Sequence, residues 1–400
     1  MGSKWDTIES DPAVFTGLLE QLGVEGVEVA EVLTLDDLPA CCHGLIFLFQ
    51  YTGQAPAPPA ACTSASPAAA APWFARQTIH NACGTQALLH ILLNRAATHT
   101  FSLGPVLEGF RSFTAALPPE ERGSCFEQCE AIRSAHNSFA RPEPFLREER
   151  AARPGEKGRA PFHFLAYTEL GGQVYELDGL SARGAVALGA AAPPSEGASW
   201  LQVARAAITA RVAQYSSGAG SGGGEIRFSL LAVVPDALLA LRQRFSAACA
   251  ALERQHALLQ SHGAEGGLEA PGSALARWRS SHPGLTPAPL PPAAAAGEGA
   301  LEAAEQALDP QALAASYSAL LASLEAVAEG AGEELRKRAA WGVENAQRRH
   351  NFVPLIMALL SGLAEGGVLG LELSAARGRY AGRLQRARQE GRDAMEEEDQ

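Results

Sequence analysis

The 400-residue sequence has no apolar segment of the roughly 18 residues that a helix needs to span a lipid bilayer. The apolar runs at 45–49 and 230–234 have only the length of a buried strand. The first residues also lack the apolar stretch of a secretory signal. From these absences we expect a protein that works inside the cell and away from membranes.

Cysteine pairs of the CxxC type are missing, although the chain has seven cysteines. An odd number without such pairs argues against a disulfide framework and for a reducing setting. Cys125 and Cys129 are four residues apart on a predicted helix, a spacing that can bind a metal, but no second ligand pair follows at a suitable distance. We interpret them as core residues and expect neither a metal nor a cofactor.

Basic residues are outnumbered, since 32 Lys and Arg stand against 44 Asp and Glu and give a net charge of −12. This balance argues against a general nucleic-acid binder and suits a partner with a basic surface. The arginines between 377 and 392 could contact nucleic acid or an acidic partner, but such a charge run on a terminal helix is usually a solvated face. Direct binding of nucleic acid is therefore not expected.

The first 236 residues carry a mixture of helix and strand patterns. Ser10-Asp11-Pro12 predicts a helix start, and apolar residues at helical spacing continue to Gly23. Gly171-Gly172 separates two alternating segments and predicts a β-hairpin over 162–178. Together they predict an α+β domain over residues 1–236. Further strands are predicted at 27–33, 44–50 and 226–234, and further helices at 86–93, 105–116, 124–138 and 200–215.

The composition of the residues after 236 divides them into a helix, a linker, a helical domain and a tail. A connecting helix is predicted over 237–262, followed by a Gly, Pro and Ala rich linker over 263–300. Residues 301–389 have helical periodicity and form a predicted C-terminal docking domain, before an acidic tail at 390–400. The Ala, Pro, Ser and Thr rich stretch 52–72 interrupts the first domain as a predicted surface insertion.

Cys83 stands at the start of a predicted buried helix. Unpaired N–H groups and the helix dipole favour a thiolate at such a position, and Gly84 leaves room for a close approach. The alternative is a buried cysteine that only fills the core, which is the commoner case for an arbitrary cysteine. The surrounding residues must therefore decide whether Cys83 is a nucleophile.

Three residues supply what a catalytic thiol requires, namely a base, a group that orients the base and a donor for the oxyanion. His163 lies in one strand of the predicted hairpin, and Asp178 ends the partner strand, where it could orient the imidazole. Gln77, six residues before Cys83, could aim its side-chain amide at the oxyanion. Each is weak evidence by itself, but the combination predicts nucleophilic catalysis by a thiol.

The sequence around these residues resembles a known family, the papain-like ubiquitin C-terminal hydrolases of peptidase family C12. The resemblance extends from Trp5 to about Asp236 and implies an α+β fold with a central, mostly antiparallel sheet threaded as a backbone knot, an exception to the usual rule. The segments that carry it are Gln77, Asn81-Ala82-Cys83-Gly84-Thr85, Phe162-His163-Phe164 and Tyr175-Glu176-Leu177-Asp178-Gly179-Leu180.

The resemblance implies a thiol-dependent deubiquitinase that cleaves peptide or isopeptide bonds after the terminal glycine of ubiquitin. It implies Cys83 as nucleophile, His163 as general base and acid, Asp178 as its orienting group and, as the oxyanion donor, Gln77. Glu9 and Asp11 are candidates for an acidic rim that meets the arginines of the ubiquitin tail; the alternative is that they only cap a helix. A loop at about 146–161 is expected to lie across the site and limit the size of the leaving group.

Further motifs resemble the proteasome-associated subgroup of the family, the isozyme L5 type. The resemblance implies a C-terminal domain that binds the ubiquitin receptor of the proteasome cap or, alternatively, a chromatin-remodelling complex, in the cytoplasm and nucleus. Candidate docking residues at helical spacing are Phe352, Leu355, Ile356 and Leu359. The motifs are His136-Asn137-Ser138-Phe139-Ala140-Arg141, Gly224-Glu225-Ile226-Arg227-Phe228 and Arg348-Arg349-His350-Asn351-Phe352-Val353-Pro354-Leu355-Ile356.

Two other functions are compatible with parts of these patterns. A chromatin-directed deubiquitinase acting on a core histone would share the C-terminal domain, but it would carry a much longer central insertion. A non-catalytic ubiquitin-binding scaffold would share the fold, but it would not need all four catalytic candidates.

Overall fold

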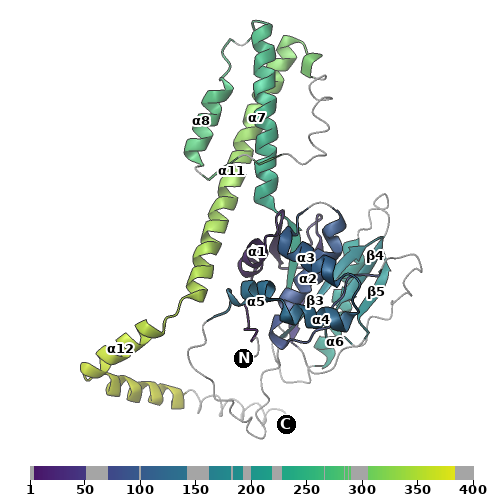
Figure 1. The fold of residues 1–400 in the computed structure, drawn as a ribbon. Coiled ribbons are helices and arrows are strands. Elements are labelled where there is room, and N and C mark those ends of the chain that lie inside the picture. The colour runs from purple at the N-terminus through teal and green to yellow at the C-terminus, as the bar shows by residue number, and fades with distance from the viewer. Residues whose placement is uncertain are drawn as a thin grey trace, which may run out of the picture. The chain divides into compact units, whose positions relative to one another are not determined.

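The computed structural model describes two compact units (Figure 1). The first comprises residues 1–141 and 151–348, and the second comprises residues 142–150 and 349–400. The described residues are 4–50, 71–98, 101–141, 162–181, 183–191, 200–218, 228–264, 266–282, 284–286, 288–289 and 305–382.

Several predicted segments lie outside these described residues. They are nearly all of the insertion at 52–72, all of the loop at 146–161, most of the motif at 224–228, and the acidic tail at 390–400. The knot likewise stays a prediction.

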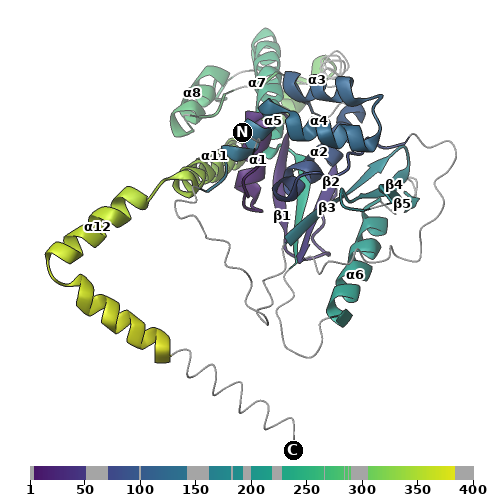
Figure 2. The same ribbon diagram turned by 60° about the horizontal axis from the view of Figure 1, so that its bottom comes forward.

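A six-stranded sheet forms the centre of the first unit (Figure 2). Its order is β1-β6-β2-β3-β4-β5, and all of its strand pairs are antiparallel. The continuous apolar run of β2 lies in the middle of the sheet, where both faces of a strand are covered. The strands are β1 (Val27–Val32), β2 (Gly44–Gln50), β3 (Phe162–Leu170), β4 (Gln173–Leu177), β5 (Ala185–Ala190) and β6 (Ser229–Pro235).

Helices cover both faces of this sheet, and each face has its own hydrophobic core. Helix α2 (Cys83–Arg95) is buried along almost its whole length and packs on β3 and β2, while α1 (Pro12–Gln21) packs on β1. Helix α6 (Trp200–Gly218) packs on the opposite face. This layered arrangement confirms the predicted α+β class. Three more helices join the α2 side: α3 (Gly104–Thr114), α4 (Pro119–Gln128) and α5 (Glu130–Asn137).

The predicted helix over 124–138 is wrong in one respect, because the chain forms α4 and α5 with a break at Cys129, whose ψ is 101°. At 3.6 residues per turn, a continuous helix would point Ile132 about 120° away from Phe126. The break allows both side chains to enter the same core. Cys125 and Cys129 therefore do not share one face of one helix.

Three helices pack together beyond the sheet, and the two long ones, α7 and α11, run side by side (Figure 1). Their common core includes Phe245, Trp278 and Tyr317, one from each helix. Helix α8 lies inside the stretch predicted as a linker. Ala274 and Trp278 are four residues apart on it, so one face of the helix is buried despite the Gly and Pro content of the stretch. The helices are α7 (Ala237–Ser261), α8 (Pro271–Ser281) and α11 (Pro310–Arg349).

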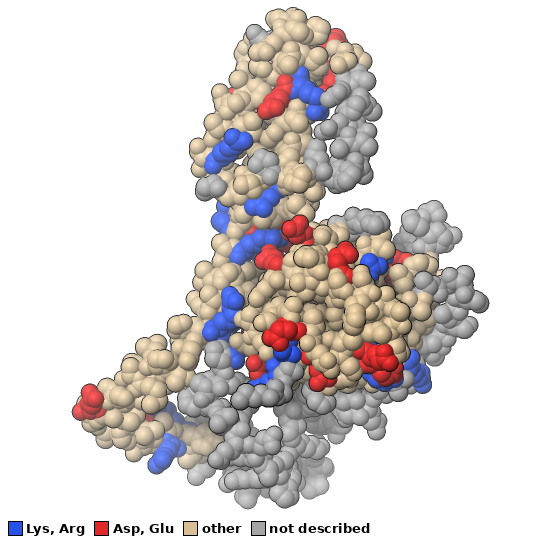
Figure 3. Space-filling model, in the orientation of Figure 1, with Lys and Arg blue, Asp and Glu red and all other residues tan. Residues whose placement is uncertain are grey.

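Helix α11 also contacts the edge of the sheet through ion pairs. Arg338 lies 3.0 Å from Glu28 of β1 and 2.7 Å from Asp236, which follows β6. Glu28 is buried, so its charge would be costly without these partners. Figure 3 shows basic and acidic side chains adjoining where α11 meets the sheet domain.

The second unit contains α12 (Val353–Glu365) and a helix over Leu369–Gly382. None of the side chains of α12 is buried. In the described part of the chain no single helix is long and apolar enough to cross a membrane; these two helices meet that criterion only as a pair bent by 108°.

Candidate active site

Cys83 is the first residue of α2, as the sequence predicts, and follows a short 3-10 helix at His80–Ala82. Its thiol therefore lies at the positive end of the helix dipole. The next residue, Gly84, is required by packing, because a Cβ there would lie 2.9 Å from the ring of Phe15. A larger residue would displace α1 or move the helix start that carries the thiol.

The β-hairpin brings His163 and Asp178 together. Gly171 and Gly172 both have positive φ, which permits the tight turn between β3 and β4. In the resulting register Leu177 pairs with Ala166, and Asp178 is the next residue along the chain. The side chain of Asp178 therefore lies diagonally across from His163, on the same face of the sheet. Nε2 of His163 lies 2.7 Å from a carboxylate oxygen of Asp178, which leaves Nδ1 for the thiol of Cys83.

These contacts control the charge of the histidine. Burial opposes a charged imidazole and lowers the pKa of His163, but hydrogen bonds with Asp178 and Cys83 outweigh burial and raise this pKa to about 9. Burial likewise opposes the charged form of Asp178, yet the hydrogen bond from His163 holds the pKa of the carboxyl below its usual value. The imidazolium form is therefore favoured at neutral pH.

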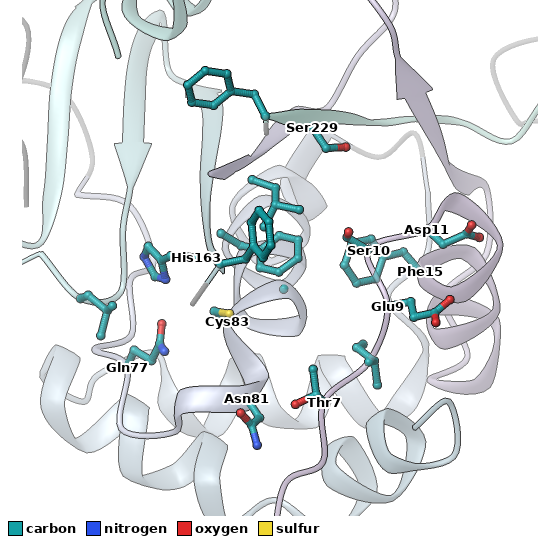
Figure 4. A pocket seen from close by; sticks show the side chains of 17 residues that line it. Thr7, Glu9, Ser10, Asp11, Phe15, Gln77, Asn81, Cys83, His163 and Ser229 are labelled. Atoms are coloured by element: carbon teal, nitrogen blue, oxygen red, sulfur yellow. The ribbon is translucent and has the colours of Figure 1, made fainter. Parts of the chain in front are cut away.

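Gln77 lies beside the thiol in the segment that precedes the 3-10 helix (Figure 4). Its backbone N–H donates to the carbonyl of Gly179, which ties it to the turn after Asp178. Its side-chain amide donates to the carbonyl of Ile79 at 2.8 Å. Because an amide group has two hydrogens, one donor remains for an oxyanion at the thiol.

A pocket of about 1050 Å³ opens over these groups. Figure 4 shows Cys83 at its floor, with His163 and Gln77 on one side and Glu9 and Asp11 on the other. The pocket is therefore lined by all of the predicted site residues of the first domain except Asp178, which lies behind the imidazole. The remaining lining residues are Thr7, Ile8, Ser10, Phe15, Leu48, Asn81, Gly84, Phe162, Phe164, Leu180, Phe228 and Ser229.

The two rim carboxylates already have partners in this structure. Asp11 accepts a hydrogen bond from the backbone N–H of Ala13 and so caps α1. The guanidinium of Arg348, from the end of α11, lies 2.8 Å from Asp11 and 3.1 Å from Glu9. Arg141 makes a further ion pair with Glu9. Capping and a position on the rim are thus compatible, but the sequence pattern contained no signal for the pairing with Arg348.

Sequence reasoning also missed the side chains that hold the N-terminal segment at the pocket, which include Asn81 and His136. The signal was present in the motif at 136–141, which carried a resemblance but no role. In the described part of the chain, no group of three or more His, Cys, Asp or Glu side chains is arranged to hold a metal ion.

The predicted docking residues lie in the second unit. Leu355 and Leu359 of α12 are 56% and 59% exposed, and Phe352 and Ile356 are also exposed. An exposed apolar helix face of this kind suits binding to another protein.

Two family models match the chain. One, described as ubiquitin carboxyl-terminal hydrolase, family 1, covers residues 5–213. The other, a C-terminal model of the ubiquitin carboxyl-terminal hydrolases, covers residues 332–369.

Curated relatives match over long stretches. Ubiquitin carboxyl-terminal hydrolase isozyme L5 of Dictyostelium discoideum is 32% identical over 365 residues, which are 90% of this chain and 92% of that protein. Ubiquitin carboxyl-terminal hydrolase 2 of Schizosaccharomyces pombe is 39% identical over 249 residues, 60% of this chain and 76% of that protein.

Solved structures give a further comparison. The catalytic domain of Trichinella spiralis UCH37, crystallised with ubiquitin vinyl methyl ester, is 34% identical and aligns with 58% of this chain and 96% of its own, with a TM-score of 0.45. The family models and relatives confirm the resemblance read from the motifs. The chain belongs to ubiquitin carboxyl-terminal hydrolase family 1, the cysteine-type deubiquitinases.

Proposed function

We propose that Cys83 is the nucleophile of this deubiquitinase, that His163 moves the protons and that Asp178 orients His163. One observation carries this assignment: the 2.7 Å pair of Asp178 and His163 leaves the second ring nitrogen to face a thiol at the start of a buried helix. Base, orienting group and nucleophile are thus connected in the order that thiol catalysis requires.

In the first step the thiolate of Cys83 attacks the carbonyl carbon of the terminal glycine of ubiquitin. The resulting oxyanion accepts hydrogen bonds from the side-chain amide of Gln77 and the backbone N–H of Cys83. His163 then gives its proton to the departing amine, and a thioester remains. In the second step His163 removes a proton from water, the water oxygen attacks the thioester, and the thiolate of Cys83 leaves.

We also propose that Glu9 and Asp11 contact the arginines of the ubiquitin tail. Both carboxylates line the pocket, and both already hold one guanidinium, that of Arg348. A carboxylate pair that fits a guanidinium from α11 has the geometry to accept one from a substrate. Binding of the tail would then require the tail to exchange with Arg348.

A ubiquitin probe with an electrophile at its C-terminus tests the assignment of Cys83. The full chain should form a covalent adduct, located at Cys83 by mass spectrometry of peptides, whereas the Cys83→Ala protein should form none. Absence of an adduct with the wild-type chain would favour the alternative of a non-catalytic ubiquitin-binding scaffold.

We further propose that the second unit docks the enzyme on the ubiquitin receptor of the proteasome cap, in the cytoplasm and nucleus. The support is the exposed apolar face of α12 and the similarity of the whole chain to an isozyme L5. The alternative is a chromatin-remodelling complex, which the resemblance to the isozyme L5 type also implies.

Affinity capture with the full chain distinguishes docking on the proteasome from docking on a chromatin complex. Proteasome subunits should be recovered with the wild type and lost with the double substitution Leu355→Asp and Leu359→Asp. Leu371→Asp is a matched control, because Leu371 is 74% exposed on the neighbouring helix. Recovery of chromatin-remodelling subunits alone would contradict the proteasome assignment, and imaging of the tagged chain would test the two compartments.

A further inference from the structure

The N-terminal strap, defined as residues 4–11, forms one wall of the pocket. Five consecutive strap residues, Thr7 to Asp11, line the cavity opposite His163 (Figure 4). The strap precedes α1 and belongs to neither a helix nor a strand. Its position relative to Cys83 must therefore come from contacts made by other elements.

Two neighbouring side chains at the end of α5 make three hydrogen bonds to the backbone of the strap. Asn137 accepts a hydrogen bond from the N–H of Asp6 at 3.0 Å and donates one to the carbonyl of Lys4 at 2.9 Å. Nε2 of His136 lies 2.7 Å from the carbonyl of Asp6. The intervening carbonyl, that of Trp5, accepts from Asn81 at 3.0 Å. Three successive strap residues are thus held by their backbone.

His136 connects the strap to the helix that carries the thiol. Its other ring nitrogen, Nδ1, lies 2.7 Å from the hydroxyl of Thr85, in the first turn of α2. A carbonyl can only accept, so Nε2 must carry the hydrogen, and in the neutral ring Nδ1 accepts from the Thr85 hydroxyl. His136 is completely buried, which favours the neutral ring.

Other residues of the same motif act on the same region. Arg141 pairs with Glu9, a strap residue on the pocket rim. The ring of Phe139 fills the space beside Gly17 of α1, where a Cβ would lie 2.9 Å from it. The proposed chemistry gives the motif at 136–141 no role. Its residues instead hold the strap in place, from Lys4 at its start to Glu9 on the pocket rim.

We propose that His136 and Asn137 are positioning residues for substrate binding: they hold the strap at a fixed distance from Cys83 and so set the width of the groove that receives the ubiquitin tail. This inference rests on the proposed function, because it takes the pocket to be the tail groove. A loosened strap should weaken binding of the tail while leaving the thiol and its base in place.

Steady-state kinetics with a fluorogenic amide of ubiquitin test this role. In the full chain, His136→Ala should raise KM about tenfold and change kcat less than about threefold. Asn137→Ala should raise KM about fivefold, and because Asn137 is only half-buried this variant keeps the test available if the histidine variant fails to fold. His136→Gln retains a donor for the Asp6 carbonyl and should recover part of the loss.

Two controls separate this role from general damage to the fold. Ser134→Ala changes an exposed side chain of α5 that makes no contact with the strap, so KM should stay at the wild-type value. The rate at which iodoacetamide alkylates Cys83 needs no strap and should be the same in all variants.

Wild-type KM in both His136→Ala and Asn137→Ala would overturn the inference, as would slower alkylation in proportion to the loss of turnover. Failure of the wild-type chain to react with the ubiquitin probe would instead overturn the assignment of the pocket. The two failures are therefore distinguishable.

Discussion

The pocket around Cys83 and the surface of α12 differ in how far their side chains are buried. In the pocket, His163 and Asp178 are buried and hydrogen-bonded, and the thiol begins a helix that is covered on all sides. On α12, not one side chain is buried, although the helix is rich in leucine. The chain therefore completes its chemical site by its own packing, whereas it leaves the apolar side chains of α12 exposed.

The largest effect is expected at the thiol. Cys83→Ala should abolish hydrolysis of ubiquitin amides, because no other group in the pocket can form the thioester. Cys125→Ala is the matched control, since Cys125 lies on α4 and should tolerate the change with full activity. Residual turnover above the uncatalysed rate in the Cys83 variant would show that the chemistry lies elsewhere.

Removal of the orienting carboxylate should have the next largest effect. Asp178→Asn should lower kcat/KM by about 10³-fold, because the imidazole loses the charge that fixes its orientation. It should also move the alkaline limb of the pH profile from about 9 to lower pH, since Asp178 helps to raise the pKa of His163. Profiles of kcat/KM between pH 6 and 10 would reveal the shift.

The pair of His163 and Asp178 also makes the stability of the fold depend on pH. The pKa of His163 is raised on folding to about 9, so its contribution is complete below the ordinary value of about 6.5 and is lost as pH rises from there to 9. Denaturant unfolding at pH 6 and pH 9 should show this loss in the wild type and a smaller loss in Asp178→Asn. An equal loss in both proteins would count against the pairing.

The oxyanion donor should contribute less than the triad. Gln77→Ala should reduce kcat by about 10²-fold with little change in KM, because the amide acts only on the charge of the transition state. Gln77→Glu keeps the size of the side chain and removes the donor, so it should lose as much. If Gln77→Glu retains wild-type kcat, the amide is not the donor.

A change at the rim of the pocket is expected to cause a small decrease in KM. Arg348→Ala should lower KM for ubiquitin amides about threefold, because it leaves Glu9 and Asp11 available to the tail, and should cost about 1 kcal/mol in stability through lost ion pairs. Arg336→Ala, at an exposed position of α11, is the control. An unchanged KM would remove the rim carboxylates from the binding site.

The smallest effect on turnover is expected from α12. The double substitution Leu355→Asp and Leu359→Asp should leave kcat and KM for a small ubiquitin amide unchanged in the isolated chain, because both side chains are exposed and belong to the second unit. Reduced turnover in the isolated chain would mean that α12 contributes to the site itself, and would break the contrast between the two regions.

Local patterns were sufficient to predict the elements that carry the chemistry. Asp11-Pro12 begins α1, and Gly171-Gly172 turns the hairpin, because capping and positive φ are properties of a few adjacent residues. The hairpin register follows from that turn, so the nearness of His163 and Asp178 was already present in the sequence. Strand β5 was not predicted, since its Ala and Gly content shows no alternation of apolar and polar residues.

By itself the sequence determined the family, the four candidate residues and the helix start at Cys83, because motifs and caps depend on neighbours along the chain. Only the tertiary structure decided the break at Cys129, the pairing of Arg348 with Glu9 and the attachment of the strap to His136. These contacts join residues that are 130 or more positions apart or depend on which face meets a shared core. Such partners are selected by packing and burial, which leave no periodic trace in the sequence.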